Sequence, residues 1–148
     1  MIDLVLHNRT TSRTWGPAFF KRAAAAAETN LKIPRRHTAE LGISLVGPSA
    51  IRALNKQWRR KDKPTDVLSF ALPMRPIAGY TAVSLGDLFI CPAVVRAKAK
   101  AAGRSVRDQM AWTVVHGLLH LAGYDHERGP RAAARMAAAE RTILKRIL

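Results

Sequence analysis

The chain has 148 residues, 48% of them hydrophobic, which suits one compact domain over residues 1–148. Its single cysteine, Cys91, excludes a disulfide framework and indicates a reducing compartment. No apolar run approaches the ~18 residues of a membrane span, and the N-terminus lacks the basic start of a signal peptide. We therefore expect a soluble, cytoplasmic protein with no membrane partner.

Predicted helices and strands alternate along the chain, without internal repeats or a linker. In chain order we expect a strand over Ile2–Leu6, a helix over Pro17–Glu28, a strand over Leu41–Val46, a helix over Pro48–Trp58, strands over Asp66–Phe70 and Ser84–Ile90, a helix over Pro92–Ala102, a helix that starts at Ser105, and a last helix after Pro130. This alternation indicates an α/β or α+β domain with a small mixed sheet. The irregular stretch Leu72–Ala82 is a candidate mobile flap.

The helix that starts at Ser105 is uncharged over most of its length. Ser105 and Asp108 have capping-box spacing, and no Asp, Glu, Lys or Arg occurs between Met110 and Tyr124. One side of the helix is a broad apolar arc. The opposite side carries a narrow polar stripe, which consists of Gln109, Thr113, His116 and His120. The stripe could be a solvent-facing surface. Because such surfaces usually carry charges, we favour the interpretation that it lines a cleft.

Three histidines in this region have metal-ligand spacing. His116 and His120 project from one helix face, and Gly123 can reverse the chain and bring His126 alongside them. Three imidazoles leave the fourth position of a tetrahedral zinc ion open, as in catalytic sites, and nickel would suit the same ligands. Cys91 is expected to be a buried small hydrophobe, with a fourth metal ligand as the alternative.

The spacing H-x-x-x-H-x-x-G-x-x-H also occurs in metzincin metallopeptidases. In those enzymes a glutamate follows the first histidine and acts as the general base, whereas this chain has Gly117. A metallopeptidase is a rival hypothesis because of the shared spacing. The missing general base and the basic surface argue against it.

The charge balance points to a polyanionic partner. Lys and Arg number 25 against 10 Asp and Glu, which leaves +15, although a general preference for Arg and Ala codons would have the same effect. Six basic residues lie close to Trp58 in the sequence: Arg52, Lys56, Arg59, Arg60, Lys61 and Lys63. They could bind an RNA phosphate backbone while Trp58 stacks on a base. The alternative is that they form only a solvent-exposed charged turn.

Three motifs resemble those of the bacterial YbeY-type endoribonucleases, metal-dependent factors in ribosomal RNA maturation. The motifs are Leu54-Asn55 through Arg59 to Asp62-Lys-Pro-Thr-Asp-Val-Leu-Ser-Phe70, Leu85-Gly-Asp87, and His116-Gly117 through His120-Leu121 to Gly123-Tyr-Asp-His126. The resemblance covers most of the chain. It implies an α+β domain with a mainly parallel four-stranded sheet, about five helices and a core similar to that of metalloproteases.

The resemblance also implies the site and the activity. His116, His120 and His126 would hold one zinc ion, and Arg59 would be the basic catalytic residue that faces it. Arg60, Lys61 and Lys63 are further candidates for substrate binding. The implied function is single-strand endonuclease action in 16S rRNA processing, ribosome maturation and ribosome quality control. The implied partners are ribosomal RNA, the small ribosomal subunit and ribosome-associated proteins.

The mechanism that we expect uses the metal and Arg59 together. Zinc lowers the pKa of a bound water towards ~7, and either this water or the RNA 2′-hydroxyl would attack the phosphodiester. Arg59 would clamp the phosphate and stabilise the transition state. Asp66, Asp87 and Asp125 could orient a histidine or relay a proton, although Asp125 is expected to cap the turn before His126. A non-catalytic RNA-binding assembly factor with a structural metal is the second rival.

Overall fold

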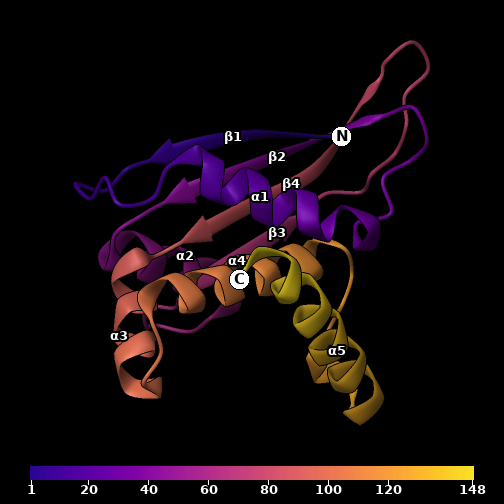
Figure 1. Ribbon diagram of the computed structural model, residues 1–148. Coiled ribbons are helices and arrows are strands. Elements are labelled where there is room, and N and C mark those ends of the chain that lie inside the picture. The colour runs from indigo at the N-terminus through magenta and orange to yellow at the C-terminus, as the bar shows by residue number, and fades with distance from the viewer.

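A four-stranded sheet organises the computed structural model, which describes residues 1–148 (Figure 1). The strands are β1 (Ile2–Asn8), β2 (Thr38–Leu45), β3 (Val67–Ala71) and β4 (Ala82–Ile90), arranged in the order β1-β2-β4-β3. β1, β2 and β4 are parallel, and β3 pairs antiparallel with β4 at one edge. The prediction of a small, mainly parallel mixed sheet of about four strands is confirmed.

Five helices accompany the sheet, as predicted: α1 (Pro17–Ala27), α2 (Pro48–Arg59), α3 (Pro92–Ala102), α4 (Val106–Leu121) and α5 (Pro130–Ile147). All except α4 begin at a proline, whose fixed φ suits the first helical position. Figure 1 shows α4 running beneath the sheet, with α3 at its left and α5 at its right. None of the helices combines the length and apolarity that a membrane crossing requires.

The main core lies between one face of the sheet and helices α1, α4 and α5. Leu41 and Leu88 of the sheet are almost fully buried there, and Val114 and Leu118 of α4 are fully buried. The apolar arc predicted on α4 is therefore the surface that packs in the core. At roughly 1.5–3 kcal/mol for each large apolar side chain, this burial is the main force that holds α4 in place.

Helix α2 packs on the opposite face of the sheet, around a smaller cluster. Val67 and Leu88 approach α4, so the alternate residues Leu68 and Phe89 face the other side. There they join Ile51 of α2. Cys91 is fully buried in this cluster, as expected of a small hydrophobe, and the alternative of a fourth metal ligand is wrong.

The strand limits differ from the predicted ones by up to three residues: β1 continues to Asn8, β2 begins at Thr38 and β4 begins at Ala82. The prediction missed the start of β2 because exposed and buried residues alternate at this end of the strand, which therefore lacks an apolar run. Two short 3-10 turns, Glu28–Asn30 and His126–Arg128, were not predicted.

The connection 72–81 between β3 and β4 is irregular, as predicted, with Ile77 and Tyr80 exposed. Its mobility stays a prediction.

Candidate metal centre

The three histidines converge because α4 ends one residue before a tight reversal. Ser105 caps the start of α4 by accepting a hydrogen bond from the Asp108 backbone N–H at 3.0 Å. Gly123, with φ +93°, turns the chain back after the helix and leads to His126. One potential ligand atom from each of His116, His120 and His126 lies within 4.8 Å of the other two.

The arrangement of these nitrogens fits a metal ion. Nε2 of His120 lies 3.1 Å from Nε2 of His116, close to the separation of about 3.3 Å that two imidazoles on one tetrahedral zinc ion would have. Burial lowers the pKa of His120, and repulsion from His116 and His126 acts in the same direction. This shift favours the neutral ring that a metal requires. Since His126 is exposed, the cluster is open to solvent on one side. The three side chains could therefore hold a metal ion.

A carboxylate from α5 orients the first of these histidines. Nδ1 of His116 lies 2.7 Å from Oε1 of Glu140, and both side chains are largely buried. Because an ionised carboxylate only accepts, Nδ1 donates, and the lone pair of Nε2 points towards His120. Sequence reasoning missed Glu140. The available signal was that it is the only acidic residue of α5 and lies on the same apolar stripe as Met136 and Ile143.

Trp112 supports His116 from the preceding turn of α4. The two rings stack with centroids 4.5 Å apart and an interplanar angle of 22°. The contact with Glu140 and the stacking on Trp112 together fix the position and the tilt of the His116 ring. Sequence reasoning missed Trp112 as well, because it lies beside the predicted polar stripe rather than on it.

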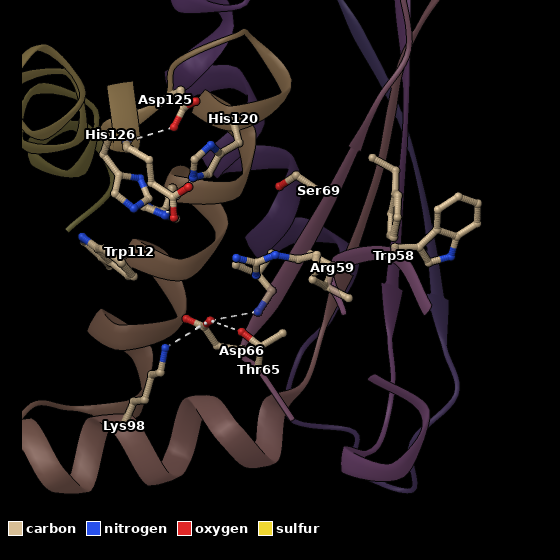
Figure 2. Close-up of a pocket in the computed structure, with 15 residues that line it drawn as sticks. Trp58, Arg59, Thr65, Asp66, Ser69, Lys98, Trp112, His120, Asp125 and His126 are labelled. Carbon is tan, nitrogen blue, oxygen red and sulfur yellow. Dashed lines mark hydrogen bonds and ion pairs between the residues drawn. The ribbon is translucent and has the colours of Figure 1, made fainter. Parts of the chain in front are cut away.

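The histidines open into a cleft of about 580 Å³, which Figure 2 shows with its lining side chains. Arg59, the last residue of α2, points its guanidinium into this cleft, towards the side on which the histidines and Asp66 lie. Arg59 is exposed and forms no ion pair with any carboxylate of the chain. The structure thus brings Arg59 and the three histidines into one cavity, while their roles in catalysis and metal binding stay predictions.

A tied loop after α2 sets the direction of Arg59. Arg60 ends the helix in the left-handed conformation, with φ +56°. The side-chain amide of the buried Asn55 donates to the Lys63 carbonyl at 2.8 Å, and Arg52 pairs with Asp62 at 2.8 Å. The hydrogen bond from Arg52 lowers the pKa of Asp62. These contacts tie the middle of the loop, at Asp62 and Lys63, back to α2.

The other basic residues of this loop lie outside the cleft. Arg60, Lys61 and Lys63 are exposed to solvent and do not line the cavity that holds Arg59. Their predicted role in substrate binding stays a prediction, and any contact they made would lie beyond the rim of the cleft.

Of the three aspartates considered for a supporting role, none contacts a histidine. Oδ1 of Asp125 accepts from the Glu127 backbone N–H at 2.9 Å, so its expected role as a cap is confirmed. Asp87 lies against Gly42 of the neighbouring strand and does not line the cleft. Asp66 does line it but pairs with Lys98.

Gly117 marks the closest approach of α4 to the sheet. A Cβ atom at this position would lie 3.1 Å from side-chain atoms of both Leu88 and Val67. The position at which metallopeptidases have their glutamate is thus turned towards packed strands. The cleft that contains the histidines has no general base on α4 beside His116.

Comparisons with known proteins agree with this geometry. Residues 7–148 match the family described as Endoribonuclease YbeY. Proteins with that name are 34% identical over 99% of this chain in Persephonella marina and 39% identical over 84% in Lacticaseibacillus casei, with 94% and 82% of those proteins covered. A longer relative from Myxococcus xanthus is 50% identical over 105 residues, which are 71% of this chain and 35% of that protein.

A solution structure of a Thermotoga maritima protein has a similar fold. It superposes with a TM-score of 0.62 at 26% identity and covers 99% of this chain and 89% of its own. Since the family match spans nearly the whole chain, including the three histidines and Arg59, the chain belongs to the endoribonuclease YbeY family.

Proposed function

We propose that this protein is a metal-dependent endoribonuclease that cleaves single-stranded segments of ribosomal RNA during maturation and quality control of the small ribosomal subunit. The observation that carries the proposal is the convergence of three imidazoles and the unpaired Arg59 in one open cleft. The net charge of +15 and the names of the family relatives support an RNA substrate. Such a substrate would place the activity in the cytoplasm, among ribosomes and ribosome-associated proteins.

The metal would be held by His116, His120 and His126, with zinc as the proposed ion and nickel as the alternative. The chemistry that such an ion supplies when bound is Lewis acidity towards oxygen. Glu140 contributes by holding the Nδ1 proton of His116, which keeps Nε2 free for ligation. Trp112 contributes by preventing rotation of the same ring.

Arg59 would bind the scissile phosphate. Its guanidinium can donate two parallel hydrogen bonds to non-bridging phosphate oxygens, and no carboxylate of the chain competes for it. As negative charge grows on these oxygens during attack, the bonds strengthen and lower the barrier. Trp58, which is 62% exposed beside Arg59, offers a flat surface on which an unpaired base could stack.

Purified enzyme and a matched inactive variant test the proposal. The metal-replete protein should cleave a single-stranded ribosomal RNA fragment, and His116→Ala with His120→Ala, purified identically, should not. Equal cleavage by both would identify a contaminating nuclease and overturn the proposal. Normal RNA binding without cleavage, for zinc and nickel alike, would show a non-catalytic assembly factor. Digestion of casein instead of RNA would show a peptidase.

A further inference from the structure

A buried carboxylate lies in the cleft away from the histidines. Asp66, directly before β3, is only 5% exposed. Its Oδ1 accepts from the Val67 backbone N–H at 3.0 Å and from the Thr65 hydroxyl at 3.3 Å, and its Oδ2 accepts from the Thr113 hydroxyl at 3.4 Å. Thr113 is fully buried on the stripe of α4 that also carries the histidines. Asp66 is therefore fixed to both β3 and α4.

This carboxylate holds a cation at the wall of the cleft. Nζ of Lys98, from α3, lies 3.2 Å from Oδ1 of Asp66, and both residues line the cavity that contains Arg59 and the histidines (Figure 2). The Lys98 side chain is 49% exposed, whereas that of Asp66 is 7% exposed. An ammonium group has three hydrogens, so the contact with Asp66 leaves two that can be donated into the cleft.

We propose that Lys98 binds a backbone phosphate of the RNA next to the phosphate at Arg59, with Asp66 as its positioning residue. This inference rests on the proposed function. Asp66 has three neutral donors besides Lys98, so its hydrogen bonds alone do not require the cation. A lysine anchored in this way loses less side-chain entropy on binding than a free one. The strand would run along the cleft from the histidines past Arg59 to Lys98.

The salt dependence of RNA binding distinguishes this role from a structural one. Each phosphate contact contributes about 0.7 to the slope of log affinity against log salt for a single strand. Lys98→Gln should lower the slope by that amount and weaken binding about fourfold at 0.15 M salt. Lys98→Arg should restore both. The matched control is Lys100→Gln, because Lys100 is exposed on the same helix but does not line the cleft.

Binding is measured by fluorescence anisotropy with metal-replete protein and a 2′-O-methyl RNA, whose integrity is checked on a gel. Cleavage of unmodified RNA is measured in parallel, and Lys98→Gln should raise KM more than it lowers kcat. A melting curve confirms that each variant is folded at the assay temperature. If Lys98→Gln and Lys100→Gln showed equal salt-dependence slopes while the parent cleaved RNA normally, the phosphate-binding role of Lys98 would be overturned and the nuclease proposal would stand. Failure of the parent to cleave would overturn the nuclease proposal and leave the slopes to test the phosphate contact.

Discussion

Nδ1 of His116, on α4, lies 2.7 Å from Oε1 of Glu140, on α5. This contact joins the proposed metal centre to a helix that supplies no ligand. The orientation of the first histidine therefore depends on how the last helix packs against α4.

Replacing Glu140 with Gln should weaken metal binding. Partners of ligand histidines typically contribute 10–100-fold to affinity, and an amide holds the ring less strongly than a carboxylate. Competition titration with a chelating dye measures the change. Glu127→Gln is the matched control, because Glu127 lines the cleft but its carboxylate forms no hydrogen bond or ion pair with a histidine. Unchanged zinc affinity in Glu140→Gln would show that the contact serves only packing.

Reversing the charge at Arg59 should abolish most cleavage without unfolding the protein. Loss of a donor to the transition-state charge costs about 10²–10³ in kcat. Arg59→Glu should change the melting temperature little, since Arg59 is exposed and unpaired. Arg22→Glu, on the exposed side of α1, controls for the charge change. Retained cleavage in Arg59→Glu would remove Arg59 from the mechanism.

Metal should stabilise the fold through the three histidines. A ligand at 100 times its Kd adds about 2.7 kcal/mol to the free energy of unfolding. For a domain of this size, that amounts to a rise of roughly 5–11 °C in melting temperature. His116→Ala with His120→Ala should melt at the same temperature with zinc or with chelator. A zinc-dependent shift in this double variant would indicate a different binding site.

Acid should destabilise the metal-free protein. The pKa of His120 is lowered by burial, so the folded state binds fewer protons than the unfolded state as pH falls below about 6.5. The contribution of this group to stability is fully present above that pH and declines below it. Urea unfolding at pH 7.5 and 5.5 measures the decline, which should be smaller in His120→Gln. An equal decline in both proteins would assign it to other groups.

Gly86 should tolerate no side chain. It has φ +116°, and a Cβ atom there would lie 2.0 Å from the Phe70 carbonyl oxygen of β3. Gly86→Ala should cost more than about 3 kcal/mol of unfolding free energy. Gly103→Ala is the control, because Gly103 also has a positive φ but has open space around it. It should cost only about 1 kcal/mol. Equal losses in urea unfolding would mean that backbone strain, not the clash, sets the cost.

The parts of the site that follow from local geometry could be predicted from the sequence. The spacing of His116 and His120 on one helix, with Gly123 as the reversal, determines where His126 lies without knowledge of the rest of the fold. The alternation of elements and the family resemblance likewise indicated the sheet and its five helices. Strand ends with polar residues, such as Thr38, could not be located, because their pairing depends on neighbouring strands.

The parts that depend on packing between distant segments could not be predicted. Glu140 is 24 residues from His116, and its meeting with that ring requires the crossing of α4 and α5. Lys98 and Asp66 meet because α3 packs beside α4, to which Asp66 is tied through Thr113. For Glu140 the visible signal was an acidic residue on the apolar stripe of α5, and Asp66 was a candidate supporting residue, but the sequence did not reveal the partner of either.

The close contact of Gly117 with Leu88 and Val67 limits how this scaffold can evolve. A Cβ atom there already requires these two side chains to move by a few tenths of an ångström, and a glutamate would place its carboxylate against apolar side chains, where an unpaired charge is costly. Because position 117 is directed towards the sheet, this scaffold disfavours a peptidase-type base next to the first histidine.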